Sequence, residues 1–196
     1  MHSLIFATNN KNKAEEIRAV LNDQFSIITL KEAGIDIDIP EPHERLEENA
    51  TEKSRTIFNM TGKDCFSEDT GLEVFALNGK PGVHSARYAG NNGNAQNNIS
   101  KLLKNLEDIQ DRKARFRTVI SLMINGKEQQ FEGICPGQIT FVEKGANGFG
   151  YDAIFIPDGS TKTFAEMTME EKNRFSHRKK ATNLLVKYLN TPDGKN

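Results

Sequence analysis

The stretch around which the chain is organised is Cys65-Phe66-Ser67-Glu68-Asp69-Thr70-Gly71-Leu72-Glu73-Val74-Phe75. Two apolar, strand-forming runs flank its centre, and we expect Gly71 to allow a sharp turn between them. Because successive side chains of a strand point to opposite faces, Glu68 and Asp69 should face different ways unless the chain has already turned. Acids at a strand end commonly hold a metal ion or act as a general base. A solvated turn explains Asp-Thr-Gly as well.

Length and composition indicate one domain, or one domain with two lobes, over residues 1–196, with a disordered tail after residue 190. The chain has 26 Lys and Arg against 27 Asp and Glu, a net charge of -1, so no global field favours nucleic acid or an anionic membrane. No apolar run approaches the roughly 18 residues of a membrane span, and the N-terminus lacks a signal-peptide pattern. Cys65 and Cys135 lie in strand-like runs without metal spacing, and two reduced, buried thiols fit a cytoplasmic protein.

The N-terminal segment predicts a strand, a polar loop and a helix. A short buried strand is expected over residues 3–8, and a helix over residues 14–21 that buries Ile17, Val20 and Leu21. Between them lies Asn9-Asn10-Lys11-Asn12-Lys13. Two lysines before a helix N-terminus are suited to binding an anion. Taken alone, these residues fit an ordinary loop with solvated lysines somewhat better, and the Gly-Lys-Ser/Thr ending of a Walker loop is missing.

An acidic helix follows two more extended segments. Residues 25–30 predict a second strand, and the alternating residues 35–39 predict an edge strand or extended segment that ends at Pro40. A helix is expected from about Glu44 through Met60, with Gly62 past its end.

The acids of this helix permit two interpretations. Glu44, Glu48 and Glu52 share a face, which would repel itself unless cations are near. In the simpler interpretation the helix is solvated and Lys53 neutralises it with Arg55. In the second, functional interpretation, Glu41 at the helix entry joins Glu68 and Asp69 around a divalent cation, with Lys53 facing the same cleft.

The middle of the chain predicts a functional loop and a hairpin. Residues 79–90 form a long loop rich in Gly and Pro, of a length that is more often functional than not. A helix is expected over residues 94–106. Asn125-Gly126 predicts a tight hairpin between a strand over residues 114–124 and a return strand over residues 129–135 that stops at Pro136.

The C-terminal third contains a second polar cluster. Asn147-Gly148-Phe149-Gly150-Tyr151-Asp152 precedes a strand expected over residues 153–156, and an aromatic ring on such a glycine-rich loop can stack on a flat base. Ser176 is a natural N-cap for the last helix. His177 and Arg178 would lie in its first turn, where the dipole disfavours cations unless an anion or a carbonyl offsets the cost. A basic helix start in water is the equal alternative.

Six motifs together match a known pattern. They are Thr8 to Lys13; Glu48-Asn49-Ala50 with Lys53; Glu68 to Leu72; Pro81-Gly82 with Ser85 to Tyr88; Gly148 to Asp152; and Lys172 with Ser176-His177-Arg178. In this order and spacing the chain closely resembles the Ham1/inosine triphosphatase family from about Leu4 to Leu189. The resemblance implies an elongated α/β fold, with a mixed β-sheet, flanking helices and two lobes around a central cleft, and a homodimer. It also implies magnesium-dependent hydrolysis of ITP, dITP and XTP to the monophosphate and pyrophosphate.

The resemblance also implies roles for individual residues. Asp69 looks like the general base and a magnesium ligand, and Glu41 and Glu68 look like further acids around the metal. The residues that look like a triphosphate clamp are Thr8, Asn9, Asn10, Lys11, Asn12, Lys13, Lys53, Thr70 and Lys172. Those that look like a base pocket are Phe149, Gly150, Tyr151, Asp152, His177 and Arg178. Donors such as Arg178 and His177 would pair with a 6-keto purine and be left unpaired by ATP, at roughly 1–3 kcal/mol per buried donor.

The chain departs from the family pattern at four places. Asn9 stands where many relatives have Gly, Glu68 where bacterial relatives often have Asp, and Ala153 where Pro is usual. The Gly-Thr pair that usually precedes the acidic helix is missing around His43. These departures bear on which residues bind the metal more than on which reaction the resemblance implies.

Two other functions compete with this hypothesis. One is a Maf-like pyrophosphatase acting on modified pyrimidine or thymidine triphosphates, against which the Phe149 to Asp152 and Ser176 to Arg178 motifs argue. The other is a non-catalytic nucleotide or RNA binder, against which the near-zero net charge and the full set of acids argue.

Overall fold

The computed structural model describes residues 2–21, 25–90 and 93–195, and the chain divides into two compact units. The first unit comprises Met1–Asp69, Thr118–Gly133 and Arg178–Asn196, and the second comprises Thr70–Arg117 and Ile134–His177. Each unit is therefore built from segments that are far apart in the sequence.

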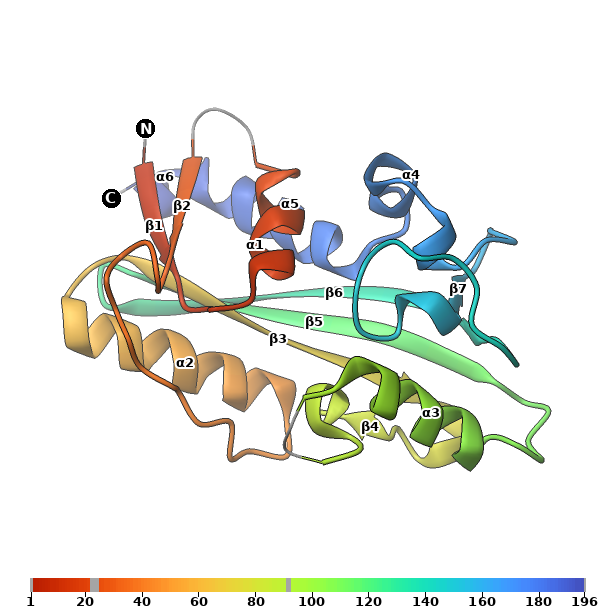
Figure 1. The fold of residues 1–196 in the computed structure, drawn as a ribbon. Helices are drawn as coiled ribbons and strands as arrows, with labels where there is room; N and C mark the ends of the chain where they lie inside the picture. The colour runs from red at the N-terminus through yellow and green to blue at the C-terminus, as the bar shows by residue number, and fades with distance from the viewer. Residues whose placement is uncertain (1, 22–24, 91–92, 196) are drawn as a thin grey trace. The chain divides into compact units, whose positions relative to one another are not determined.

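Strands and helices alternate from His2 to Val74, and three helices follow one another at the C-terminal end of the described chain (Figure 1). The strands are β1 (His2–Phe6), β2 (Phe25–Thr29), β3 (Cys65–Val74), β4 (Pro81–Gly82), β5 (Lys113–Ile124), β6 (Lys127–Ile139) and β7 (Phe155–Pro157). The helices are α1 (Lys11–Arg18), α2 (Leu46–Thr61), α3 (Ala95–Asn105), α4 (Met169–Asn173), α5 (His177–Leu189) and α6 (Pro192–Lys195). The short helix α6 lies where the sequence predicts a tail; Asn196 is outside the described residues.

The sheet is mixed, which confirms the predicted α/β class. Within the described residues its strand order is β2-β1-β3-β5-β6-β7, and β4 pairs with β3. β1 lies parallel to both β2 and β3, whereas β4 and β7 pair antiparallel with their neighbours. The predicted Asn125-Gly126 turn joins β5 to β6, and both of its residues have positive φ, as a tight hairpin requires.

In the first unit, the alternation of strand side chains creates two apolar layers. Leu4 and Phe6 of β1 pack with α1 and α5, together with Leu185 of α5. Ile5, one residue away on the opposite face, packs with Ile57 of α2. The two neighbouring strands are further joined by Phe6 and Phe66, whose rings stack with centroids 4.5 Å apart. A stacked pair of this kind adds about 0.5–1.5 kcal/mol beyond its area burial.

The second unit has its own core. Leu72 of β3, Leu102 of α3 and Phe116 of β5 pack there with aromatic residues of the C-terminal segments. Phe116 contacts Phe155 edge to face with centroids 4.7 Å apart. The core therefore fixes the segment from β7 to α4, which supports the second polar cluster.

Gly71 does not make the turn that the sequence predicts. β3 runs unbroken from Cys65 to Val74, and Leu72 is paired with Gly82 of β4. A Cβ atom on Gly71 would lie 2.7 Å from the carbonyl oxygen of Gly82. Glycine is needed here because the backbone of β4 approaches closely, and such a requirement looks the same in a sequence as a turn.

Other boundaries differ for identifiable reasons. α1 begins at Lys11 rather than residue 14 because the Asn10 side chain accepts a hydrogen bond from the backbone N–H of Lys13, 3.2 Å away, and caps the helix. β6 continues through Pro136, whose side chain is exposed and whose carbonyl accepts from the backbone N–H of Asp158. Residues 35–39 form no strand; their isoleucines pack on the core beside α2.

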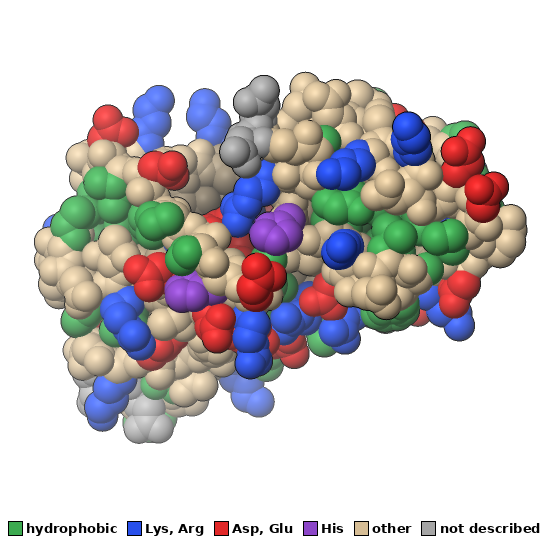
Figure 2. Space-filling model, turned by 90° about the horizontal axis from the view of Figure 1, so that it is seen from below, with side chains coloured by type: hydrophobic (Ala, Val, Ile, Leu, Met, Phe, Trp, Pro, Cys, Tyr) green, Lys and Arg blue, Asp and Glu red, His purple; other side chains and the backbone are tan. Residues whose placement is uncertain are grey.

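One face of the molecule has mixed charge (Figure 2), in agreement with the near-neutral balance of the sequence. Figure 2 shows basic and acidic side chains interleaved on one face of the molecule. No helix in the described part of the chain is long and apolar enough to cross a membrane.

Candidate functional site

The two adjacent acids of β3 lie on opposite faces of the strand, as its alternation predicts. β1 ends at Phe6, which is in register with Phe66, while β3 continues past this point. Glu68 and Asp69 therefore lie where the parallel neighbour has already ended. This carboxyl edge of parallel strands is the usual place for a ligand in open α/β sheets.

Glu68 is held by two cations on the side of α1 and α5. Arg178 donates to both of its oxygens, from Nε at 2.7 Å and from Nη2 at 3.0 Å. Lys13 adds a third contact, with Nζ 3.0 Å from Oε1. Arg178 also donates from Nη1 to Glu16 of α1. Glu16, Arg178 and Glu68 are all buried, so each of these charges depends on its partner.

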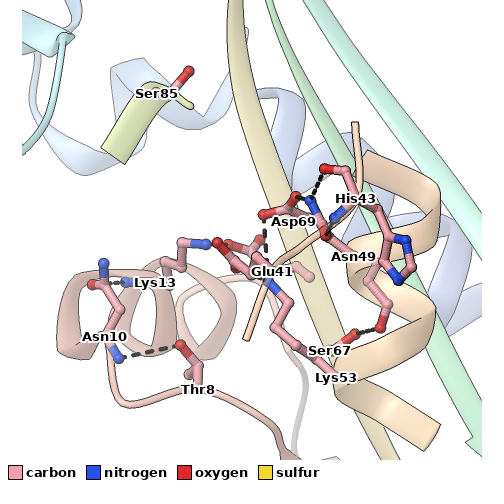
Figure 3. Close-up of polar contacts among 12 residues, drawn as sticks. Thr8, Asn10, Lys13, Glu41, His43, Asn49, Lys53, Ser67, Asp69 and Ser85 are labelled. Atoms are coloured by element: carbon pink, nitrogen blue, oxygen red, sulfur yellow. Dashed lines mark hydrogen bonds and ion pairs between the residues drawn. The ribbon is translucent and has the colours of Figure 1, made fainter. Parts of the chain in front are cut away.

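Asp69 contacts a different set of residues, on the side of α2 (Figure 3). Lys53 of α2 lies with its Nζ 3.3 Å from Asp69 Oδ1 and 2.5 Å from Glu41 Oε1. Asn49, one helical turn earlier, donates from Nδ2 to Asp69 Oδ2 at 3.3 Å. One ammonium group therefore joins two carboxylates from separate segments, Glu41 and Asp69, which the sequence predicts to gather around a divalent cation.

The pKa values of these groups reflect burial and opposing charges. Burial alone would raise the pKa of Glu68, but Arg178 and Lys13 outweigh it and hold the pKa well below its usual range. Burial raises the pKa of Asp69, and Lys53 offsets this only in part. Burial would lower the pKa of Lys53, yet Asp69 and Glu41 raise it above the usual lysine value. The two neighbouring acids thus differ in the direction of their pKa shifts. The lowered pKa keeps Glu68 ionised, whereas the raised pKa of Asp69 makes this carboxylate the better proton acceptor.

The polar loop before α1 lies in the same unit. Thr8 Oγ1 accepts from the backbone N–H of Asn10 at 3.1 Å, which gives the loop its tight shape. Asn9, Asn10, Lys11 and Asn12 are exposed, and Lys13 is half-buried on Glu68. The loop therefore presents the first turn of an eight-residue helix beside the two acids of β3.

The oxygen-rich set around Asp69 suits a hard cation. Glu41 and Asp69 already share one positive group, and magnesium prefers carboxylate oxygens together with water and phosphate. Glu68, predicted as a third ligand, is instead directed to Arg178 and Lys13. Across residues 2–21, 25–90 and 93–195, no three His, Cys, Asp or Glu side chains are arranged as a ready metal site. Glu41 and Asp69 are the pair that fits.

The second unit contains the other predicted cluster. Lys172 of α4 and Asp152 form a buried ion pair, with Nζ 2.6 Å from Oδ2. The same Asp152 oxygen accepts from the backbone N–H of Phe149 at 2.9 Å. Lys172 Nζ also lies 5.3 Å from the centre of the Phe149 ring. Lys172, which the resemblance places in the triphosphate clamp, lies beside the aromatic loop in the structure.

The remaining predicted residues of this unit have ordered positions. Tyr151 is buried and donates from its hydroxyl to the carbonyl of Ser85 at 2.9 Å, while Gly150 adopts positive φ. His177 is buried, and its ring stacks on Phe116 with centroids 4.7 Å apart. Thr70 lies half-buried on β3.

Two residues with polar contacts at the site were not predicted as site residues. Glu16 is 4% exposed and anchors Arg178, although it stands in a helix that reads as amphipathic. Asn49 is fully buried, although it lies in a run of charged residues. Their positions in the sequence are the one signal that could have identified them. Glu16 is next to Ile17, which is predicted to be buried, and Asn49 is one helical turn before Lys53, which is predicted to be functional.

Comparisons with known proteins agree on one family. A family model described as the Ham1 family matches residues 4–188. The dITP/XTP pyrophosphatase of Flavobacterium johnsoniae is 49% identical over 186 residues, covering 95% of this chain and 97% of the relative. That of Porphyromonas gingivalis is 48% identical over 190 residues, covering 96% and 98%. The solved Ham1 protein of Coxiella burnetii has a TM-score of 0.88 at 37% identity, covering 96% of this chain and 98% of its own. For the Ham1 protein of Staphylococcus aureus the TM-score is 0.86 at 39% identity, with 95% and 97% covered.

Proposed function

Since the chain belongs to the Ham1 family, we propose that it hydrolyses the non-canonical purine nucleoside triphosphates ITP, dITP and XTP to the monophosphate and pyrophosphate. The reaction is magnesium-dependent and removes these nucleotides before they enter DNA or RNA. The names of the full-length relatives support the substrate class, because identity near one half extends over almost the whole chain.

The observation on which the proposal rests is the single ammonium group of Lys53 shared by Glu41 and Asp69. This ammonium group links acids from two separate segments, Glu41 before α2 and Asp69 on β3, and both Lys53 and Asp69 are buried. A triphosphate has about four negative charges near neutral pH, so its hydrolysis needs both cations and a base. Lys13 and Lys53 supply the cations within this unit, and Asp69 supplies the base.

In the proposed reaction Asp69 accepts a proton from the attacking water. The water oxygen bonds to the α-phosphorus, the bond from that phosphorus to the bridging oxygen breaks, and pyrophosphate leaves with the electron pair. The raised pKa of Asp69 suits this task because a general base works best when its pKa is nearer the operating pH. Glu41 and Asp69 would hold Mg²⁺, which when bound neutralises charge on the phosphate oxygens.

Recognition of the base is assigned to the second unit. Phe149 is half-buried and lies on a loop fixed by Asp152, so its ring is held for stacking on a purine. Lys172 beside this ring is a donor suited to a purine keto oxygen. His177 stays in the proposal as a second donor. Arg178 already donates to Glu68 and Glu16, so a bond to a base would compete with these contacts.

A panel of triphosphates tests the proposal. ITP, dITP, XTP, ATP, GTP and dTTP are compared at equal concentration, with magnesium and with a chelator, and pyrophosphate release is measured. We expect rapid release from the first three with magnesium and little from the others. Preference for dTTP would instead support a Maf-like activity, and binding of ITP without turnover would support a nucleotide-binding protein. The homodimer and the cytoplasmic location are part of the same proposal, and sedimentation equilibrium tests the first.

A further inference from the structure

Asn49 holds both the backbone that precedes α2 and the carboxylate of Asp69. Its side-chain oxygen Oδ1 accepts from the backbone N–H of His43 at 3.0 Å, and Nδ2 donates back to the His43 carbonyl at 3.1 Å. The second hydrogen of Nδ2 points to Asp69 Oδ2 at 3.3 Å. Figure 3 shows the Asn49 amide between the His43 backbone and Asp69.

The orientation of this amide is determined by its partners. A flipped side chain would place Oδ1 against the carbonyl of His43 and the carboxylate of Asp69, two groups that only accept. The residue is 0% exposed, so water cannot replace a lost partner. Asn49 is therefore a fixed donor to Asp69.

Asn49 and Lys53 divide the two oxygens of Asp69 between them. They are four residues apart on α2 and so lie on one face of the helix, where Lys53 contacts Oδ1 and Asn49 contacts Oδ2. Two donors on two different oxygens hold the plane of a carboxylate in one orientation. A carboxylate that must take a proton from a positioned water needs such an orientation, since misplacement by about 1 Å can cost about 100-fold in rate.

The contact with His43 extends the effect of Asn49 to Glu41. Glu41 is two residues before His43, and its carboxylate reaches Lys53 at 2.5 Å. Arg45 at the N-cap of α2 makes no side-chain capping bond, so Asn49 takes over the task of joining the preceding segment to the helix. One amide thereby sets the positions of both carboxylates that contact Lys53.

We propose that Asn49 is a positioning residue of the reaction: it orients Asp69 and fixes the Glu41 segment without touching substrate. This inference rests on the proposed function, because it assigns Asp69 the role of base. It concerns a residue that the resemblance places inside a motif without giving it a task.

The chain contains a matched control in its second unit. Asn98 is the fourth residue of α3, as Asn49 is the fourth residue of α2. It too is buried, accepts from the backbone N–H of Ala89 at 2.7 Å, and donates to the carbonyl of Ala86 at 3.0 Å. With a further contact to the Ser85 carbonyl at 3.4 Å, these partners are all backbone groups. Asn98 therefore reproduces the connection to a preceding loop without the contact to a carboxylate.

The test compares Asn49→Ala and Asn49→Asp with Asn98→Ala, and measures kcat, KM and the melting temperature. Asn98→Ala should lower the melting temperature. At an assay temperature well below the melting range, its kcat and KM should stay within about twofold of the wild-type values. Asn49→Ala should lower the melting temperature by a similar amount and kcat by about 10–100-fold, with KM within about threefold. Asn49→Asp keeps an acceptor for His43 but puts a carboxylate against Asp69, so its kcat should fall at least as far.

Hydrogen exchange gives a measurement that does not depend on turnover. The amide of His43 should exchange faster in Asn49→Ala and remain slow in Asn49→Asp, because the aspartate still accepts its hydrogen bond. A crystal structure of Asn49→Ala should show Asp69 rotated from its wild-type orientation.

The outcomes separate this inference from the proposed function. Unchanged kcat in both Asn49 variants, with loss of stability alone, would overturn the positioning role. If the wild-type protein released pyrophosphate from no triphosphate, the proposed function would fail. Hydrogen exchange at His43 and the orientation of Asp69 in Asn49→Ala would still decide whether Asn49 holds the His43 backbone and the Asp69 carboxylate.

Discussion

The two units of this protein bury ion pairs of different composition. In the first, the ion pairs join four carboxylates, Glu16, Glu41, Glu68 and Asp69, to three cations, Lys13, Lys53 and Arg178. In the second, apart from the partly exposed pairs of Glu73 with Arg115 and Arg117, a deeply buried pair joins Lys172 to Asp152 beside aromatic rings. The first group has one negative charge in excess and can accept a further cation. The deeply buried pair of the second is neutral and suits an uncharged, flat group such as a base.

This comparison predicts that changes in the first unit affect the rate, whereas changes in the second affect substrate binding. The largest expected effect belongs to Asp69→Asn. The amide keeps the shape of the side chain but cannot take a proton, so kcat should fall by about 10²–10⁴-fold. Pyrophosphate release measures the rate, and circular dichroism checks that the fold is kept. Activity equal to wild type would remove Asp69 from the mechanism.

Glu68→Gln is expected to act on stability first. It leaves the buried Arg178 with one fewer carboxylate, and breaking a buried pair in this way costs about 3–5 kcal/mol of unfolding free energy. Urea denaturation gives the value.

Lys172→Met is the counterpart in the second unit, since it leaves Asp152 without its cation. A loss below about 1 kcal/mol in either variant would show that water or a rearranged partner replaces the missing charge.

The pH dependence of stability distinguishes Glu68 further. Its pKa in the folded protein is held below the ordinary value of 4.5, mainly because Arg178 and Lys13 overcome the effect of burial. The stability contributed by these contacts is therefore fully present above about pH 4.5 and is lost as the pH falls toward the folded pKa. Urea midpoints between pH 3 and 6 should show this slope in wild type and a shallower one in Glu68→Gln. An equal slope in the two proteins would contradict the assignment.

Phe149→Ala has the smallest expected effect and tests the second unit. Loss of a stacking ring costs about 1–3 kcal/mol, so KM for ITP should rise by about 5–150-fold while kcat changes little. Steady-state kinetics with ITP make the measurement. Phe141→Ala is a suitable control because Phe141 is an exposed aromatic residue of the same unit with no role in the proposed site. A fall in kcat alone would place the ring in the chemistry instead.

Local patterns in the sequence were sufficient for much of the fold. The period of two in β3 predicts that Glu68 and Asp69 face apart, and Asn94 was predicted at the start of the helix that it caps. Gly71 was misread because glycine serves a turn and a close backbone approach equally well. Helix α1 was placed too late because Asn10 was read as loop rather than as a cap.

Partners distant in sequence could not be found from local patterns. Arg178 and Glu16 are 162 residues apart, and no spacing rule relates them. The family resemblance places Lys172 in the phosphate clamp; its contact with Asp152, 20 residues earlier, depends on how the second core packs. The family resemblance predicts which residues belong to the site, whereas the contacts between these residues are seen only in the structure.

The continuity of β3 has a consequence for how this protein tolerates insertions and deletions. Phe66 is fixed in register by β1, and the faces of Glu68 and Asp69 follow from it by simple alternation. A single residue gained or lost between Phe66 and Glu68 would exchange the two acids, turning the arginine-bound anion toward Lys53 and the base toward Arg178. Nearby loops can change length over evolution, but this interval of the strand cannot vary by one.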